Sequence, residues 1–404
     1  MADLRTKLGS LELDNPIIVS SGYATETESA IAKADAFRPG GIIMKTSLPN
    51  DEYVKVVKPY APHRFPSTRA KFDSCEDGLM GAEALSTLSL ELWAEWLAKN
   101  QSKFQSLLIA SVAAVSVEGH VRGARLMEEA GAKAVELLLA CPAPYFKPHK
   151  YTMTQDAQVV REICTAVKQA VKIPVGVKIM PFSYLARAAR EAGVDWITLG
   201  GVFLASPGID LETLEPKVPG AVFISGSRLY KYVTCKALLT VSKMARDVHF
   251  SAHGGVQDWK DAAEFILYGA RSVQAQSVFM LKGFKVIADM KKGLSDYMDR
   301  KGFASIEAMR GAMVRKVLTF DEMVSLYAET KGKIIAEVDE SLCNGCMICE
   351  EVCAFDAIKV PDGLAVVNAD LCEGCRLCVA DCPPRALSLT NMALMKKEAA
   401  AAAV

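Results

Sequence analysis

The feature that most constrains the fold is a pair of identical cysteine motifs near the C-terminus. Both have the spacing C-x2-C-x2-C-x3-C, in "CNGCMICEEVC" and "CEGCRLCVADC". In two-cluster iron–sulfur modules, short turns bring the first three thiolates of a motif to one cluster, while its fourth cysteine ligates the other cluster. The spacing therefore predicts two 4Fe–4S clusters, one held by Cys343, Cys346, Cys349 and Cys382 and the other by Cys372, Cys375, Cys378 and Cys353.

Zinc binding and disulfide bonding are the alternative interpretations of these cysteines. Zinc sites usually pair two C-x2-C elements, and disulfides are unexpected in a reducing cytoplasm. The two half-repeats resemble a bacterial two-cluster ferredoxin, although Ala354 stands where proline commonly follows the fourth cysteine. The resemblance implies short strands near 333–338, 357–360, 364–367 and 386–390.

The cysteine-rich segment is also strongly acidic. Residues 336–388 contain ten acidic and three basic side chains, a local charge of −7, although the whole chain has a formal net charge of zero. The other residues carry 44 basic and 37 acidic groups. This distribution argues against nucleic-acid binding by the segment and favours an acidic module that docks on a basic surface.

Length and composition indicate a globular chain of two or three domains. The chain has 404 residues, of which 51% are hydrophobic and 23% charged. The start "MADLRTKLGS" lacks the basic and apolar regions of a signal peptide, and no stretch approaches the roughly 18 apolar residues of a membrane span. We therefore expect a soluble, cytoplasmic protein that does not bind a membrane.

Before the cysteines, eight apolar segments rich in β-formers alternate with amphipathic segments. The expected strands lie within 15–22, 40–47, 106–114, 134–142, 174–181, 195–202, 248–256 and 272–279, and helical patterns include 88–100, 119–131, 156–171 and 259–270. This alternation predicts an α/β fold, a (β/α)8 TIM barrel, followed by a two-cluster ferredoxin-like α+β domain. We place the barrel at 1–305, a helical connection at 306–335, the ferredoxin-like domain at 336–388 and an Ala-rich tail at 389–404.

The ends of the last two predicted barrel strands indicate a phosphate site. The seventh strand ends at Gly254-Gly255 and the eighth at Gln276-Ser277, and Ser225-Gly226 offers a third segment. Barrels often bind phosphate at this place through backbone N–H groups, although a Gly-Gly pair alone could be a simple turn. No G-x-G-x-x-G motif follows a strand, so a Rossmann-type nucleotide site is not visible. FMN explains the phosphate better, because a flavin exchanges hydride with a substrate and single electrons with clusters.

Across nearly its whole length the chain resembles the dihydroorotate dehydrogenase superfamily, and most closely the FMN and iron–sulfur portion of dihydropyrimidine dehydrogenases. The resemblance rests on "NPIIVSSG", "GIIMKTS", "ELLLACPAP", "VGVKIMP", "HGGVQDWKDAAEFILYGARSVQ" and the eight cysteines. It implies FMN held near Ser21, Gly22, Lys45, Thr46, Lys178, Ser225, Gly226, Gly254, Gly255, Gln276 and Ser277.

The two lysines in this set also have a chemical rationale. A cation at the end of a barrel strand can stabilise negative charge on a reduced flavin, so we count Lys45 among the catalytic candidates as well. Interior salt bridges are the alternative role for Lys45 and Lys178.

The chain departs from the family where a pyrimidine would bind. Leu138 replaces the Asn of the family motif E-L-N-L-S-C-P, Gly201-Val202 replaces Asn-Thr after strand six, and Val117 aligns roughly with another Asn. A pyrimidine without these amide partners would keep buried, unpaired polar groups. The departures favour a substrate more apolar than uracil.

The expected proton donor differs too. The family carries a Cys in the loop after strand four, and here Met153, which cannot donate a proton, occupies that place. His149, Tyr151 and Thr152 are the candidate donors, with His149 the best matched to neutral pH, although it could equally be a solvated loop residue.

These observations favour an FMN- and iron–sulfur-dependent oxidoreductase that acts on a C–C bond of a conjugated carbonyl or ring substrate. Dihydropyrimidine dehydrogenase activity is the next interpretation. An electron-transfer subunit without substrate chemistry of its own is the third. Because no nicotinamide site is visible, we expect a partner, either an FAD- and NAD(P)H-binding subunit or a ferredoxin, and we expect an oligomer.

Overall fold

A computed structural model describes most of the chain. The described residues are 2–58, 68–72, 75–81, 85–140, 155–201, 203–205, 208–216, 222–245, 247–330 and 334–390. The chain divides into two compact units, Met1–Val314 and Arg315–Val404. The division falls inside the segment that we predicted as a helical connection, and the domain limits stated above remain predictions.

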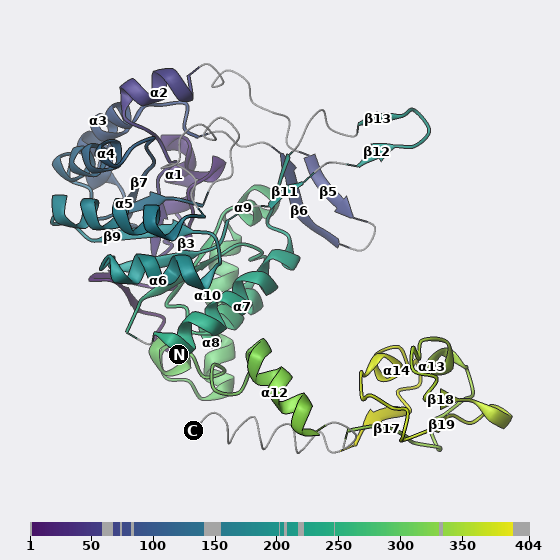
Figure 1. The fold of residues 1–404 in the computed structure, drawn as a ribbon. Coiled ribbons are helices and arrows are strands. Elements are labelled where there is room, and N and C mark those ends of the chain that lie inside the picture. The colour runs from purple at the N-terminus through teal and green to yellow at the C-terminus, as the bar shows by residue number, and fades with distance from the viewer. Residues whose placement is uncertain are drawn as a thin grey trace. The chain divides into compact units, whose positions relative to one another are not determined.

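The first unit contains a closed barrel of eight parallel strands (Figure 1). Around the barrel the order is β10-β15-β16-β3-β4-β7-β8-β9. In chain order, the strands are β3 (Ile17–Val19), β4 (Gly41–Ile43), β7 (Leu108–Val112), β8 (Val135–Leu138), β9 (Val175–Ile179), β10 (Trp196–Leu199), β15 (Phe250–His253) and β16 (Ser272–Ala275). Each lies within one of the eight predicted segments, so the predicted (β/α)8 barrel is confirmed.

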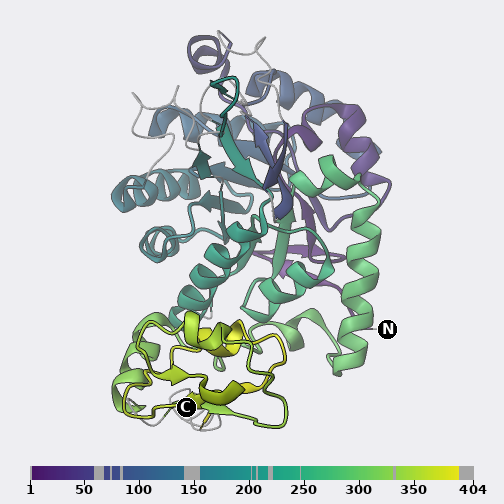
Figure 2. The same ribbon diagram turned by 90° about the vertical axis from the view of Figure 1, so that its right-hand side faces the viewer.

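Helices surround the strands, as the view in Figure 2 also shows. They are α1 (Glu28–Asp35), α3 (Leu90–Asn100), α4 (Val117–Glu129), α5 (Ala157–Ala170), α6 (Ser183–Glu191), α7 (Arg228–Met244), α8 (Trp259–Leu267), α9 (Ser277–Lys282), α10 (Val286–Lys301) and α11 (Ile306–Met309). α5 illustrates why they form: the Asp156 side chain accepts hydrogen bonds from the first-turn N–H groups, and Val160, Ile163 and Val167 are fully buried. Among the described helices, none has the length and apolar character needed to cross a membrane.

A hairpin is packed against apolar side chains of the barrel strands. β1 (Thr6–Leu8) pairs antiparallel with β2 (Leu11–Leu13). Leu8 and Leu13 pack with Ile18, Ile109 and Trp196 from the barrel strands in one buried cluster. In barrels of this kind, functional groups lie at the carboxyl end of the strands, which we call the barrel mouth.

Two insertions at the barrel mouth pair with each other. One follows β4 and contains α2 (Asn50–Val56), β5 (Thr68–Phe72) and β6 (Cys75–Gly81). The other follows β10 and contains β11 (Phe203–Ala205), the hairpin β12 (Ile209–Asp210) and β13 (Glu215–Pro216), and β14 (Val222–Ser225). The four-stranded antiparallel sheet has the order β11-β14-β6-β5, so it joins insertions that leave opposite sides of the barrel. Nothing in the sequence predicted this pairing.

The second unit contains α12 (Phe320–Thr330) and a small α+β module. Its elements are β17 (Ala336–Val338), α13 (Ile348–Glu351), β18 (Ile358–Lys359), β19 (Val366–Val367), α14 (Leu377–Ala380) and β20 (Leu387–Leu389). β17 pairs with β20 and β18 with β19, both antiparallel, and the four strands match the four predicted segments. Ala336, Ile358 and Leu387 form a small core together with Cys349, and five of the other motif cysteines pack against it.

Candidate active site

A buried carboxylate organises the polar interior of the barrel. Glu136 on β8 is 1% exposed, and its Oε2 accepts hydrogen bonds from Trp196 Nε1 (3.2 Å), Thr198 Oγ1 (2.6 Å) and Gln274 Nε2 (2.7 Å). β8 and β16 lie opposite each other in the closed strand order, so the bond from Gln274 crosses the interior. These donors offset the cost of burying the carboxylate. A lone acidic residue in an apolar strand is the sequence signal for this group, which our predictions missed.

Two lysines place positive charge at the barrel mouth. Lys178 Nζ donates to Ser20 Oγ at 3.0 Å, and Ser20 Oγ donates to Gln274 Oε1 at 3.0 Å, so Lys178 is connected to the interior network. Lys45 follows β4, and its Nζ lies 5.3 Å from the centroid of the Tyr23 ring, within the range of a cation–π interaction. Both lysine side chains are buried.

Hydroxyl groups connect the ends of β3, β4 and β7. Ser21 Oγ accepts a hydrogen bond from Thr46 N at 2.9 Å and lies 2.8 Å from Thr46 Oγ1. Thr46 Oγ1 in turn lies 2.7 Å from Ser111 Oγ. Ser21 and Thr46, two of the residues in the predicted FMN set, are therefore held together. Ser111, which was not among the predicted site residues, extends this row of hydroxyl groups.

Glycines let three backbone segments approach one another after β14, β15 and β16. Gly226 has φ of +74°, and a Cβ there would lie 2.7 Å from Ser277 Cβ. Gly255 has φ of +75°, and a Cβ there would lie 2.6 Å from the backbone N of Lys231. Both positions therefore require glycine. We call residues 226–227, 254–255 and 276–277 the glycine cradle; Ser225, the last residue of β14, directly precedes it.

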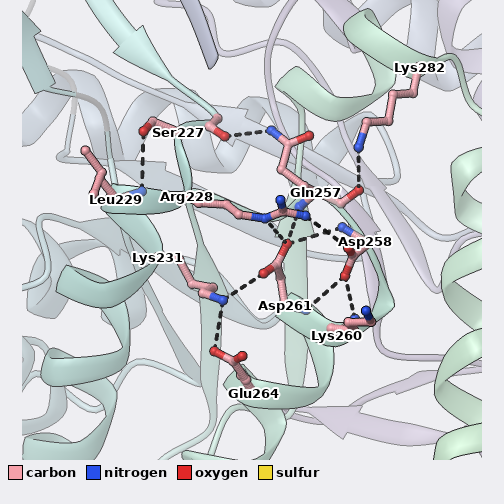
Figure 3. A network of polar contacts seen from close by, with 11 residues as sticks. Ser227, Arg228, Leu229, Lys231, Gln257, Asp258, Lys260, Asp261, Glu264 and Lys282 are labelled. Carbon is pink, nitrogen blue, oxygen red and sulfur yellow. Dashed lines mark hydrogen bonds and ion pairs between the residues drawn. The ribbon is translucent and has the colours of Figure 1, made fainter. Parts of the chain in front are cut away.

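A polar network ties the glycine cradle to the helices that follow it (Figure 3). Gln257 Nε2 donates to the carbonyl oxygen of Gly226 at 2.7 Å, and Lys282 Nζ donates to the carbonyl oxygen of Gln257 at 3.3 Å. Asp261 Oδ2 accepts from the backbone N of Gln257 at 2.8 Å. One carboxylate, one amide and one ammonium group therefore fix segments from three strand ends relative to one another.

The centre of this network is a buried ion pair. Lys231 Nζ lies 2.8 Å from Asp261 Oδ1, with the two side chains 5% and 3% exposed, and 3.0 Å from Glu264 Oε2. Burial by itself lowers the pKa of Lys231, but the hydrogen bonds to Asp261 and Glu264 outweigh it and raise the pKa. Because the folded-state pKa is raised, the stabilisation is complete below the ordinary lysine pKa and is lost only in strong base.

In the second unit, two cavities gather the eight cysteines in crossed sets. One cavity is lined by Cys343, Cys346, Cys349 and Cys382, and the other by Cys353, Cys372, Cys375 and Cys378. Each cavity takes three cysteines from one spacing motif and the fourth from the other motif. All eight are free cysteines. This is the grouping that crossed ligation of two clusters requires.

Backbone N–H groups point at several of these sulfurs. Ala357 N donates to Cys353 Sγ and Ala386 N to Cys382 Sγ, both at 3.3 Å, and Ala336 N donates to Cys372 Sγ at 3.4 Å. The first two bonds span the same four residues in each half of the module. Hydrogen bonds to ligand sulfur are one of the means by which a protein sets the potential of a cluster.

Some predicted residues cannot be placed. The candidate proton donors His149, Tyr151 and Thr152, together with Met153, lie outside the described residues, and so does Val202. Their roles stay predictions.

Comparisons with known proteins follow the same division of the chain. Residues 3–298, which include the whole barrel, match the dihydroorotate dehydrogenase family, and residues 335–358 match a 4Fe-4S binding domain that includes the first cysteine motif. The chain belongs to the dihydroorotate dehydrogenase family.

The relatives of this chain include dihydropyrimidine dehydrogenases and dihydroorotate dehydrogenases. The chain is 28% identical over 366 residues to the NAD-dependent dihydropyrimidine dehydrogenase subunit PreA of Escherichia coli, covering 87% of this chain and 85% of the relative. It is 28% identical over 312 residues to the dihydroorotate dehydrogenase B (NAD(+)) catalytic subunit of Methanothermobacter thermautotrophicus, covering 76% and 97%. The chloroplastic dihydropyrimidine dehydrogenase (NADP(+)) of Arabidopsis thaliana is 28% identical over 360 residues, covering 83% and 82%.

Family membership makes the chain a flavin-dependent oxidoreductase of the dihydroorotate and dihydropyrimidine dehydrogenase type, with an iron–sulfur domain. The family implies FMN as the flavin. The barrel mouth fits such a group, because the buried Lys45 and Lys178 carry positive charge there and the glycine cradle brings backbone segments from three strand ends close together. A 4Fe–4S cluster likewise fits cavities lined by four thiols each.

The barrel mouth has an apolar wall at Leu138, where the family resemblance led us to expect an amide. Leu138, the last residue of β8, is partly buried and packs against a cluster that includes Leu48, Tyr53 and Ala113. Its register partner on β9 is Lys178, whose side chain points into the barrel, so Leu138 faces the same side. Gly201, which follows β10, is buried and contributes no side chain.

Proposed function

We propose that this chain transfers reducing equivalents between a C–C bond of a conjugated carbonyl or ring substrate and an external electron carrier, through FMN and two 4Fe–4S clusters. The observation that carries the proposal is the pair of four-cysteine cavities in a chain whose barrel belongs to this dehydrogenase family. FMN, when bound, exchanges a hydride with a substrate and single electrons with iron–sulfur clusters.

The residues of the barrel mouth would have different roles in binding the cofactor and in the reaction. Gly226, Gly254, Gly255 and Ser277 would hold the phosphate. Ser21, Gly22, Thr46, Ser225 and Gln276 would contact the rest of the cofactor. Lys45 and Lys178 would stabilise the negative charge that gathers on a flavin when it is reduced. His149, Tyr151 or Thr152 would supply or accept the proton that accompanies the hydride.

The apolar wall supports a substrate that is more apolar than uracil. The polar edge of a uracil ring buried against Leu138 would lose hydrogen bonds to water that an apolar side chain cannot replace, which costs about 1–3 kcal/mol for each group left unpaired. An enone or an enoyl thioester presents a carbonyl but few other polar atoms to such a wall.

We expect Leu138→Asn to lower kcat/KM for an apolar enone or thioester by about 10- to 200-fold, because an amide replaces an apolar contact. Leu138→Met keeps the volume and the apolar character, so it serves as the control and is expected to change kcat/KM by a few-fold at most. Steady-state kinetics measures both. An unchanged kcat/KM in Leu138→Asn would place the substrate elsewhere in the mouth.

Removal of the Lys178 charge tests the flavin site. We expect Lys178→Met to slow substrate-dependent flavin reduction by about 10²- to 10³-fold and to lower the flavin midpoint potential, because the cation favours the reduced form. Lys291→Met is the control: this half-buried lysine donates to the carbonyl oxygens of Phe37 and Arg38, outside the mouth. Equal effects of the two changes on flavin reduction would contradict the assignment.

Dihydropyrimidine dehydrogenase activity is the second candidate function. It is favoured by the similarity to PreA and to the Arabidopsis enzyme. The third candidate, an electron-transfer subunit without substrate chemistry, is favoured by Met153 at the position of the expected donor.

Anaerobic titration separates these candidates. The purified chain is fully reduced, and flavin and cluster absorbance are followed while the unsaturated acceptors uracil, enones and enoyl-CoA esters are added. Reoxidation by an apolar enone or thioester but not by uracil is the expected result. Tight, saturable uracil turnover would make this a dihydropyrimidine dehydrogenase. Reoxidation by a partner protein alone would favour the third candidate, an electron-transfer subunit without substrate chemistry.

We also propose a partner, an FAD- and NAD(P)H-binding subunit or a ferredoxin. The proposal is supported by the names of the relatives, two of which are subunits of NAD-dependent enzymes, and by the absence of a G-x-G-x-x-G motif after any predicted strand. The purified chain is therefore expected to oxidise NADH or NADPH slowly unless a second protein is added. Rapid oxidation by the chain alone would contradict the proposal.

A further inference from the structure

His253 is the last residue of β15, and its side chain points into the barrel. In register, His253 pairs with Gln274 on β16 and stands two residues after Ser251. Register partners on parallel strands face the same side of a sheet. Gln274 Nε2 crosses the interior to reach Glu136, so His253 also faces inward, at the mouth end of the strand.

The surroundings of His253 fix its backbone and leave one ring nitrogen for a ligand. Thr234 Oγ1 donates to the carbonyl oxygen of His253 at 3.0 Å. Nδ1 is buried, and within the described residues it has no hydrogen-bond partner. Leaving such an atom unpaired costs about 1–3 kcal/mol, so a group that binds at the mouth is its natural partner.

Two causes keep the imidazole neutral. Burial lowers the pKa of His253 well below its usual value, and the positive charge of Lys178 lowers the pKa further. A neutral imidazole carries one donor and one acceptor nitrogen. It can therefore hydrogen-bond a polar edge beside Lys178 without adding a second cation to the mouth.

We propose that His253 is a further flavin-contacting residue, which hydrogen-bonds FMN through Nδ1 beside Lys178 and helps to set the flavin potential. This inference rests on the proposed function, because it requires FMN at the mouth. The immediate chain neighbours support it: Gly254 and Gly255, which follow His253 directly, belong to the glycine cradle. A ligand whose phosphate lies in the cradle would bring its remaining polar atoms toward this strand end.

The test compares His253→Leu with His253→Gln in the full-length holoprotein. We expect His253→Leu to weaken FMN binding by about tenfold, the equivalent of one lost hydrogen bond, and to shift both the flavin midpoint potential and the flavin absorption bands. His253→Gln can still form a hydrogen bond and is expected to restore much of each property. Cluster absorbance reports whether the ferredoxin-like module remains intact.

His249→Gln is the matched control. His249 lies just before the opposite end of β15, where its Nδ1 accepts a hydrogen bond from the backbone N of Gly9 at 2.8 Å. It is expected to leave the flavin spectrum and potential unchanged.

Three results would overturn the inference. If the wild-type protein binds FMN but His253→Leu leaves the affinity, spectrum and potential unchanged, His253 does not contact the flavin, although the proposed function stands. If the wild-type protein binds no FMN, the proposed function fails and the inference fails with it. If His249→Gln has the same effect as His253→Leu, the changes come from general disturbance of β15.

Discussion

Asp261→Ala is expected to lower the free energy of unfolding of the barrel by about 3–5 kcal/mol. The substitution would leave Lys231 as a buried charge without its closest partner, and breaking a buried pair from one side is among the most damaging of single changes. It also removes the acceptor for the backbone N of Gln257, whose side chain holds Gly226 in place (Figure 3). We therefore expect weaker FMN retention as well as lower stability.

Tryptophan fluorescence during urea unfolding measures this effect in the barrel alone. All four tryptophans of the chain, Trp93, Trp96, Trp196 and Trp259, lie in the first unit. The control is Glu264→Gln, which removes the other carboxylate that contacts Lys231. Because Glu264 is 44% exposed, its loss is expected to cost about 0–1 kcal/mol. A similarly small loss in Asp261→Ala would show that the ion pair does not hold the cradle together.

Cys382→Ala is expected to remove the cluster that Cys343, Cys346 and Cys349 would hold, although Cys382 belongs to the other spacing motif. The reason is the crossed lining of the two cavities. Iron content is expected to fall from about eight to about four atoms per chain, and electron transfer from the flavin to an external acceptor is expected to be largely lost. Flavin reduction by substrate is expected to persist, because its chemistry belongs to the barrel.

The decisive comparison is between three single variants studied by iron analysis and by electron paramagnetic resonance of the reduced protein. Crossed ligation predicts that Cys382→Ala loses the same signal as Cys343→Ala, and that Cys378→Ala loses the other one. Direct ligation, in which each motif holds its own cluster, predicts instead that Cys382→Ala resembles Cys378→Ala. A chain that holds no more than four iron atoms before mutation would refute the second cluster.

The residues of the candidate site differ in how far the sequence could identify them. Lys45, Lys178 and the pair Gly254-Gly255 lie toward the C-terminal ends of predicted strand segments, so the barrel topology was sufficient to place them at one end. Glu136 and Gln274 lie on predicted strands too, but nothing in the local sequence showed that they would meet. Their hydrogen bond joins residues 138 positions apart, and only closure of the barrel brings them together.

The network around Asp261 was equally hidden. Asp258 and Asp261 stand at the start of α8, where they form a capping box. The second role of Asp261, as the partner of Lys231, depends on the packing of α7 beside α8. A helix start is a local property, whereas an ion pair between two helices is set by tertiary packing.

The sequence by itself determined the eight barrel strands, the short strands of the ferredoxin-like module and the crossed grouping predicted for the cysteines. These follow from short-range properties: the periodicity of apolar residues and the spacing of ligands along a few turns. Only the tertiary structure decided that the two insertions pair into a sheet, that Asp261 binds Lys231, and that His253 faces Lys178 in the interior. Those contacts join distant segments, and their energies come from burial and charge that no single segment possesses.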